Sequence, residues 1–314
     1  MGTVLRHCLW FARTFVLNLS IVTHPRFSLF APQLNGWTEP MMRSLFEEFA
    51  AAAKDETVDV LVLTGAGKYY CAGVNLSGVL QPMHPQKLHD TIYTHNKQVF
   101  DTFLDFPKPI IAAINGPAIG ASVTTATLCD ALIMADGATL LTPFARLGVP
   151  PEGCSSVHFA RIMAESPMAA ASGASGATLA ARMLGPEAWT PTGAEAVALG
   201  LASAAAPEKE LLAAAQQLAE GWIMQRNLTR TVPQPESSSA SAAAVLEEYR
   251  AINDAESKEL ARAFLGPSFL EGQIAFLSSK GKAQMAAVFR LILATRPLWS
   301  KLLSPSSDIL RHKK

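Results

Sequence analysis

Two glycine-containing turns are the parts of the sequence whose spacing could support chemistry on an anionic intermediate. Each turn follows an apolar run: residues 68–76 read KYYCAGVNL, and residues 114–122 read INGPAIGAS. A strand that leads through small residues into a helix leaves backbone N–H groups free, and such groups suit a developing negative charge. Small residues also let a ligand approach the backbone closely. Two such turns could hold one oxygen from two sides, as an oxyanion hole does, although each turn alone is also an ordinary packing device.

The acidic residue best placed for chemistry is Glu152, which stands in the segment VPPEGCSS at 149–156. Phe144, a valine and two prolines precede it, and burial among apolar groups raises the pKa of a carboxylic acid. A pKa near the working pH is what a general acid or base needs. The plainer alternative is a loop carboxylate without chemistry. His158 and Cys154 lie nearby, but a lone histidine in a helical stretch and a small cysteine are more often packed structural residues.

The elements that must position these residues alternate between short apolar runs and longer helical stretches. Continuous β-branched runs predict strands covered on both faces, and apolar residues at helical spacing predict amphipathic helices. Thr38, followed by Glu39 and Pro40, is the expected N-cap of the first helix. The alternation predicts an α/β fold with parallel strands. The expected strands are residues 14–21, 58–64, 110–114 and 131–135, and the expected helices are 39–53, 86–106 and 120–128.

The C-terminal part of the chain differs in composition. Residues 231–244 (TVPQPESSSASAAA) are low in complexity and predict a surface linker. Helical segments are expected from about 245 to 265 and from 267 to 303. The last 35 residues hold eight lysines and arginines. A solvated helix face is the plain interpretation of these charges, and contact with ligand phosphates or with a neighbouring subunit is the alternative.

Composition excludes several classes of function. The 314 residues carry 26 basic and 26 acidic side chains, whereas nucleic-acid-binding proteins usually show a basic excess. The four cysteines and seven histidines are scattered without a metal-ligand spacing. No apolar run approaches the roughly 20 residues that cross a bilayer. We therefore expect no metal site, no nucleic-acid partner and no membrane insertion.

The N-terminal segment lacks acidic residues through position 38 and carries three arginines. Such a start is typical of a mitochondrial transit peptide, so residues 1–13 are a possible targeting segment. The alternative is that the first core strand simply begins early, and both can hold. Residues 311–314 (RHKK) differ from the S-K-L type of peroxisomal signal. We expect a mitochondrial location, with a peroxisomal-type organelle as the alternative.

Taken together, the two turns resemble those of the enoyl-CoA hydratase/isomerase (crotonase) family. The resemblance implies a crotonase (ClpP-like) β/α superhelix of stacked β-β-α units with a C-terminal helical region, assembled as a homotrimer or hexamer. It places the crotonase core at 14–230 and the helical region at 245–314, with the linker 231–244 between them. The matching stretches are GAGKYYCAGVNL at 65–76, PKPIIAAINGPAIGAS at 107–122, TPFARLGVPPEGCSS at 142–156 and PTGAEAVALGL at 191–201.

The resemblance also assigns roles to single residues. In the family, one backbone N–H from each turn holds the thioester oxygen of the substrate, and the matching residues here are Val74 and Ala121. Arg26, a basic residue after the first strand, is a candidate contact to a CoA phosphate. Asn75 stands where many relatives carry Asp and is interpreted as a turn cap. The residues that would line the path of CoA are Ala72, Gly73, Leu76 and Gly120.

The positions of acid and base separate the subfamilies. Hydratases carry two glutamates at positions that here are Thr124 and Phe144, and neither side chain transfers protons usefully at neutral pH. Glu152 instead resembles the single catalytic glutamate of peroxisomal-type Δ3,Δ2-enoyl-CoA isomerases, which lies in a P-E-G-C-S-S segment. One carboxylate suffices to remove a proton from C2 and return it at C4. The resemblance therefore implies an enoyl-CoA isomerase of unsaturated fatty acid β-oxidation, with no cofactor because CoA is part of the substrate.

Two alternatives stay open. The first is another acyl-CoA enzyme of the same fold, such as a hydratase, a thioesterase or a dienoyl-CoA isomerase. The last of these would normally need further acidic residues in the second turn, and residues 123–127 contain none. The second is a catalytically silent CoA-binding protein that keeps the fold and binds acyl-CoA without turnover.

Overall fold

The computed structural model describes residues 10–11, 14–18, 33–74, 84–232 and 241–302. Residues 1–9 and 12–13 of the possible targeting segment lie outside these ranges, whereas Trp10 and Phe11 of that segment form a strand of the sheet. The central part of the 231–244 linker also lies outside them, as do Arg26, Asn75 and Leu76. In the described part of the chain, no helix is long and apolar enough to cross a membrane.

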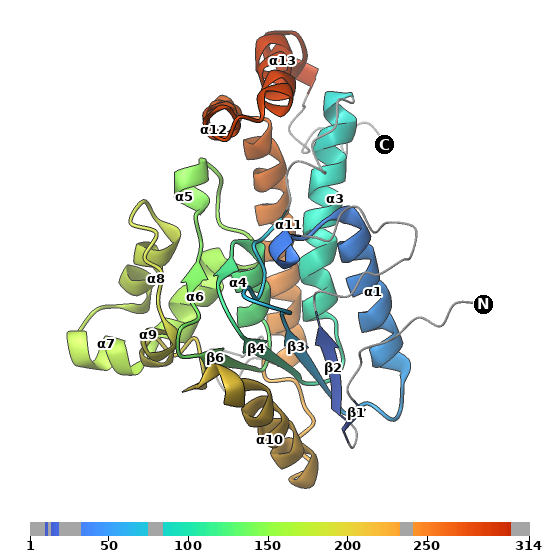
Figure 1. Ribbon diagram of the computed structural model, residues 1–314, viewed down its shortest axis with the longest axis vertical. Helices are drawn as coiled ribbons and strands as arrows, with labels where there is room; N and C mark the ends of the chain where they lie inside the picture. The colour runs from blue at the N-terminus through green and yellow to red at the C-terminus, as the bar shows by residue number, and fades with distance from the viewer. Residues whose placement is uncertain (1–9, 12–13, 19–32, 75–83, 233–240, 303–314) are drawn as a thin grey trace.

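A six-stranded sheet forms the centre of the molecule (Figure 1). Its first two strands pair antiparallel, and the remaining pairs are parallel, as the alternating sequence pattern predicted. Strands β3, β4 and β6 are buried along their whole length, because helix α10 covers one face of the sheet and other helices cover the opposite face. In sheet order, the strands are β1 (Trp10–Phe11), β2 (Thr14–Asn18), β3 (Val60–Thr64), β4 (Ile110–Ile114), β6 (Ala131–Ala135) and β8 (Ala204–Ala206).

A second layer of short strands lies above the carboxyl ends of the central strands. Strand β5 (Ala118–Ile119) pairs in parallel with β7 (Leu140–Leu141), and each follows directly on a strand of the main sheet. An isolated parallel bridge joins Cys71 to Ala118 and adds the first glycine turn to this layer. The chain thus repeats a long strand, a short strand and a helix, which is the β-β-α unit expected from the sequence.

The helices begin and end close to the expected residues. Thr38 caps the first helix, and its side chain accepts a hydrogen bond from Met41 N at 3.4 Å. This helix buries Met42, Leu45 and Phe49 against the core, as an amphipathic helix does. The helices before the C-terminal region are α1 (Glu39–Lys54), α3 (Pro85–Leu104), α4 (Ala121–Thr127), α5 (Phe144–Leu147), α6 (Ser155–Ala164), α7 (Pro167–Ser172), α8 (Gly176–Leu184), α9 (Gly193–Ala198) and α10 (Leu211–Met224).

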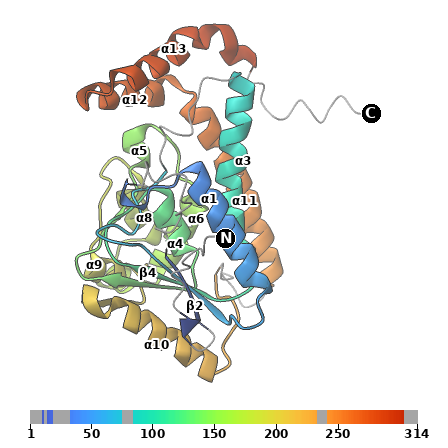
Figure 2. The ribbon, with the colours of Figure 1, turned by 45° about the vertical axis from the view of Figure 1, so that its right-hand side comes forward.

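The C-terminal region consists of α11 (Ala242–Phe264), α12 (Pro267–Ser279) and α13 (Ala283–Trp299). Helix α11 lies alongside α3, and the α12–α13 pair sits at the end of the molecule farthest from the sheet (Figure 2). The prediction of one helical segment over 267–303 is wrong, because the chain turns at Gly281 and forms two helices instead. This residue has a φ of 69°, and its N–H bonds to Ser278 O, which ends α12.

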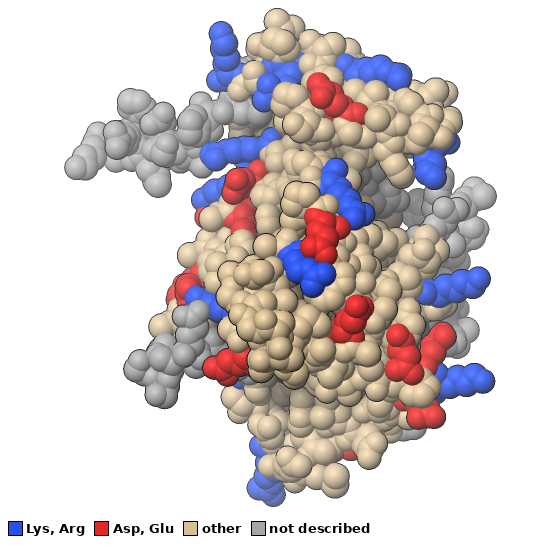
Figure 3. Space-filling model, turned by 90° about the vertical axis from the view of Figure 1, so that its left-hand side faces the viewer, with Lys and Arg blue, Asp and Glu red and all other residues tan. Residues whose placement is uncertain are grey.

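The surface charges agree with the balanced composition. Lysine and arginine side chains are interspersed with aspartate and glutamate over the face shown in Figure 3, and basic residues predominate around the C-terminal helices at the top. Within residues 267–302 the sequence has five basic residues and one acidic residue. This uneven distribution fits either interpretation offered for the basic C-terminus.

Candidate active site

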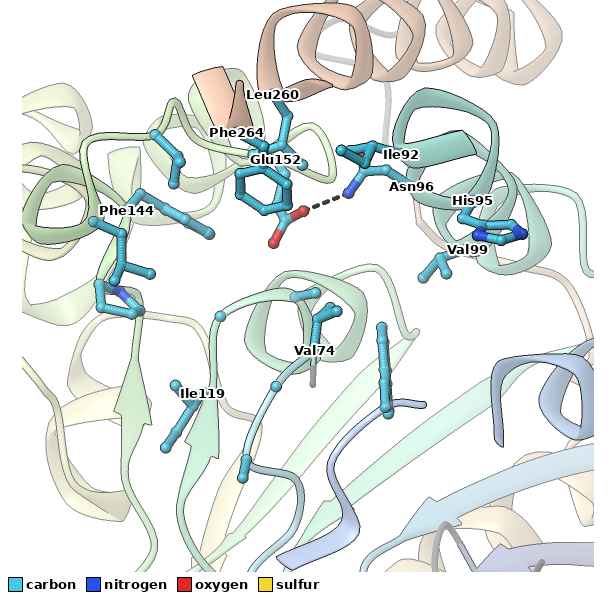
Figure 4. Close-up of a pocket in the computed structure, with 18 of the residues that line it drawn as sticks. Val74, Ile92, His95, Asn96, Val99, Ile119, Phe144, Glu152, Leu260 and Phe264 are labelled. Carbon is cyan, nitrogen blue, oxygen red and sulfur yellow. Dashed lines mark hydrogen bonds between the residues drawn. The ribbon is translucent and has the colours of Figure 1, made fainter. Parts of the chain in front are cut away.

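A largely apolar pocket opens between the two glycine turns and the paired helices α3 and α11 (Figure 4). It has an empty volume of about 880 Å³ including its open mouth. Ile92 and Val99 of α3 and Leu260 and Phe264 of α11 form one side, and the turns form the other. Two elements far apart in the sequence, α3 and α11, therefore complete a cavity whose floor comes from the core.

The two turns lie against each other, as the sequence predicted. Ile119 N donates a hydrogen bond to Cys71 O at 3.0 Å, across the parallel bridge between Cys71 and Ala118. Gly73 has a φ of 81°, and a Cβ placed on it would lie 2.8 Å from Ile119 O. The close approach of the two backbones therefore requires glycine at this position.

Val74 and Ala121 occupy equivalent places, each three residues beyond a member of the Cys71–Ala118 bridge. Both line the pocket. Ala121 is the first residue of α4, where an N–H has no partner within the helix. The bridge beside Val74 uses the carbonyl of Gly73, which accepts a hydrogen bond from Trp37 N at 2.9 Å. Within the described ranges, neither the N–H of Val74 nor that of Ala121 donates a hydrogen bond, so both could hold a ligand oxygen.

Glu152 lies across the pocket from these turns, and its carboxylate points into the cavity (Figure 4). The residue is only 6% exposed. Burial raises the pKa of Glu152 to about 7, and the nearby charge of Glu256 adds to the increase. The side chain of Asn96 opposes it by donating a hydrogen bond from Nδ2 to Glu152 Oε2 at 2.5 Å. A carboxyl group that titrates near neutral pH can both accept and return a proton.

The two positions that carry glutamates in hydratases hold no acid. Thr124 is buried, and its Oγ1 donates to Ala121 O at 3.1 Å, whereas Phe144 lines the pocket as an apolar wall. Among the described residues that line the pocket, Glu152 is the one carboxylate and His95 the one other titratable side chain. The geometry therefore offers one carboxylate opposite two N–H groups that bond to no other described residue.

Ala72, Gly73 and Gly120, the other residues assigned to the path of CoA, also line this pocket. Sequence reasoning missed Asn96 and His95, because each is a single polar residue inside a helix with no motif around it. It also missed Glu256, whose partner Cys154 is 102 positions away.

His158 and Cys154 have structural roles, as expected. His158 Nδ1 lies 2.8 Å from Tyr249 Oη, and its Nε2 lies 2.8 Å from Thr127 O. Burial lowers the pKa of His158 to about 4 and raises that of the Cys154 thiol. A neutral imidazole with both nitrogens engaged packs the interior and is not free for proton transfer. In the described part of the chain, no group of three or more His, Cys, Asp or Glu residues could hold a metal ion.

The family described as enoyl-CoA hydratase/isomerase matches residues 27–283. The chain belongs to this family. The crotonase fold is confirmed by its similarity to solved structures. An enoyl-CoA hydratase/isomerase from Pseudoalteromonas atlantica T6c superposes with a TM-score of 0.64 at 19% identity, covering 87% of this chain and 96% of that one. An enoyl-CoA hydratase from Bacillus halodurans has a TM-score of 0.63 at 19% identity, covering 86% and 98%.

Similar sequences of this family include enoyl-CoA delta isomerases. A human protein named enoyl-CoA delta isomerase 2 is 40% identical over 131 residues, which is 41% of this chain and 33% of that protein. A mouse protein named enoyl-CoA delta isomerase 3, peroxisomal, is 39% identical over 115 residues, covering 36% and 35%. The match to an uncharacterized Caenorhabditis elegans protein is 44% identical over 140 residues, covering 44% and 53%. The chain thus spans about a third to a half of the length of these relatives.

Proposed function

We propose that this protein is a Δ3,Δ2-enoyl-CoA isomerase that converts 3-enoyl-CoA to trans-2-enoyl-CoA during oxidation of unsaturated fatty acids. The observation that supports the proposal most is one buried carboxyl group, Glu152, facing two free N–H groups across an apolar pocket. The names of the human and mouse relatives point to the same reaction. A hydratase would need a second acid/base group, and Thr124 and Phe144 occupy the places where hydratases carry glutamates.

The proposed reaction moves one proton and one double bond. Glu152, as the carboxylate, removes a proton from C2 of the acyl chain. The electron pair of that C–H bond forms a dienolate that spreads over the C3–C4 double bond and the thioester oxygen. The protonated Glu152 then returns the proton to C4, leaving the double bond between C2 and C3. No atom is gained or lost, so the chemistry uses no cofactor beyond the CoA of the substrate.

The negative charge of the dienolate collects on the thioester oxygen, which we place between the N–H groups of Val74 and Ala121. These donors are fixed by the bridge between the turns, so they need not reorganise as charge develops. Removing one such donor typically lowers a rate by about 10²–10³. The apolar walls exclude water from the dienolate and strengthen these interactions.

We further propose that the protein self-associates and resides in an organelle of fatty acid oxidation. Phe276, Leu291 and Leu298 are large apolar side chains of α12 and α13 and are 55%, 61% and 80% exposed, a pattern that favours contact with another subunit. The name of the mouse relative includes the word peroxisomal, and the acid-free N-terminus is typical of mitochondrial import. Imaging of the full chain carrying a C-terminal fluorescent tag distinguishes the two organelles.

The proposed function is tested by comparing two reactions of the purified protein. One assay follows the conjugated 2-enoyl thioester formed from 3-enoyl-CoA, and the other follows hydration of 2-enoyl-CoA. We expect rapid isomerisation with negligible hydration, both unchanged after dialysis against a chelator. Hydration faster than isomerisation would contradict the proposal, as would tight binding of acyl-CoA without either reaction.

A further inference from the structure

Helix α11 carries three buried polar side chains on one face, at spacings of three and four residues. Asn253, Glu256 and Ser257 are 0%, 7% and 0% exposed. Residues at this spacing share one face of a helix, and buried polar groups require hydrogen-bond partners. Each of the three bonds either to α3, whose Asn96 contacts Glu152, or to the start of α6, which follows Glu152 in the chain.

Ser257 bonds to the residue that holds Glu152. Its Oγ donates to Asn96 Oδ1 at 2.8 Å, and Asn253 Oδ1 is a second acceptor at 3.2 Å. An ionised carboxylate only accepts hydrogen bonds, so Asn96 must present its NH₂ group to Glu152 and its oxygen to the other side. The hydroxyl of Ser257 meets that oxygen and so keeps the amide in the orientation that donates to the carboxylate.

Asn253 fixes the distance between the two helices. Its Nδ2 donates to Lys97 O at 3.0 Å and to Asp101 Oδ1 at 2.8 Å, and both acceptors belong to α3. Ser257 and Asn96 are therefore brought together by a polar contact one turn away.

Glu256 bonds to the segment that follows Glu152. Its Oε2 accepts from Cys154 N at 2.6 Å, and its Oε1 accepts from Ser156 N at 3.1 Å. Cys154 is the N-cap of α6, has a φ of 63° and provides no side-chain cap. Glu256 thus caps α6 from another helix and fixes the backbone two residues beyond Glu152.

We propose that α11 positions the acid/base residue from two sides: Ser257 orients Asn96 toward Glu152, and Glu256 fixes the backbone of the loop that carries Glu152. This inference rests on the proposed role of Glu152 in isomerisation. The two α11 residues have opposite effects on the pKa of Glu152. The donor that Ser257 orients stabilises the carboxylate, whereas the like charge of Glu256 destabilises it.

Other charged groups near these residues are engaged with each other. Lys97 pairs with Asp101, and Lys258 pairs with Asp254 at 2.5 Å. Asp254 also accepts from Tyr93 Oη at 2.6 Å. The titratable groups of α3 are Lys87, His89, Asp90, Tyr93, His95, Lys97 and Asp101. Those of α11 are Glu247, Glu248, Tyr249, Arg250, Asp254, Glu256, Lys258, Glu259 and Arg262, and those of α6 and its N-cap are Cys154, His158 and Arg161. Of these, Glu256 is the charge that raises the pKa of Glu152.

The test is a titration of Glu152 in the substrate-free protein, followed by the infrared band of its protonated carboxyl group. The Glu152→Gln variant assigns the band by difference, since Glu256 titrates over the same pH range. We expect Ser257→Ala to raise the pKa of Glu152 above its value of about 7, and Glu256→Gln to lower it. An increase of one unit would reduce the ionised fraction at pH 7 about fivefold, and kcat at that pH with it.

Ser257→Thr keeps the hydroxyl group and should restore the wild-type titration. Ser166→Ala is the matched control, because it also deletes a buried hydroxyl but one that caps α7 away from the pocket. We expect this control to be less stable with an unchanged Glu152 titration.

A Glu152 pKa that stays constant or falls in Ser257→Ala would overturn the role of Ser257. If the substitution only loosened the site, water would enter and the pKa of Glu152 would fall. A pKa that stays constant or increases in Glu256→Gln would overturn the role of Glu256. The titration needs no substrate, so its outcome is independent of the activity assays. Absence of isomerase activity in the wild-type protein would remove the proposed function and leave the titration result intact.

Discussion

Gly73 gives the sharpest prediction about how the turns hold the thioester oxygen. Its φ of 81° is unfavourable for residues with a side chain, and a Cβ would lie 2.8 Å from Ile119 O. The atom it meets belongs to the backbone of the other turn, so it cannot move aside as a side-chain end can. Gly73→Ala must therefore separate the two turns and displace the neighbouring N–H of Val74.

The magnitude follows from two separate costs. Forcing alanine into this conformation costs about 1–3 kcal/mol of stability. Displacing one of two oxyanion donors costs about 10²–10³ in kcat. Gly67 separates these effects, because its φ is 71° and a Cβ there would meet nothing within 4 Å. Gly67→Ala should therefore show only the stability cost.

The assay compares thermal unfolding and isomerase kcat for the two alanine variants. We expect both to lose stability and only Gly73→Ala to lose turnover, with a smaller change in KM because the rest of the pocket is untouched. A Gly73→Ala protein that retains kcat within a few-fold of wild type would refute the role given to the turns. Equal losses of kcat in both variants would refute it as well, since strain alone would then explain the effect.

Three further predictions concern charge burial and assembly. Burial raises the pKa of Glu152 from 4.5 to about 7, so its ionisation opposes folding above the unfolded-state pKa. Glu152→Gln should therefore be more stable than wild type at pH 8 by about 3 kcal/mol, with no gain at pH 4, as measured by urea unfolding. Burial lowers the pKa of His158 from 6.5 to about 4, so the unfolded chain binds a proton that the folded protein does not. Between pH 6.5 and 4 the free energy of unfolding of wild type should therefore fall by about 3 kcal/mol more than that of His158→Gln. A variant with both Leu291 and Leu298 replaced by lysine should sediment with a lower mass than the wild-type oligomer. A wild-type protein that is monomeric at all concentrations would exclude self-association through α12 and α13.

Much of the fold follows from local sequence patterns. The strands expected at 110–114 and 131–135 have the same bounds in the structure, because uninterrupted β-branched and small apolar runs are buried on both faces. Thr38 was predictable as a cap from its type and the two residues after it. The turn at Gly281 was missed because one glycine within a helical pattern is compatible with a continuing helix, although the polar residues on both sides of it are a turn signal.

The site was predictable only where a motif carried it. Glu152 and the two turns lie in recognisable segments, whereas the contacts that tune Glu152 join residues distant in the sequence. Asn96 is 56 positions from Glu152, and Ser257 is 161 positions from Asn96. These pairs depend on how α3 and α11 pack, which no local pattern specifies.

The most direct test of the central claim is the isomerase kcat of Glu152→Gln relative to Glu47→Gln. The control removes an exposed carboxylate on α1 that does not line the pocket. With Glu152 as the group that moves the proton, we expect Glu152→Gln to lose about 10²–10⁴ in kcat and to keep its affinity for acyl-CoA, whereas Glu47→Gln should match wild type. Equal turnover by the two variants would contradict the assignment of the base to Glu152.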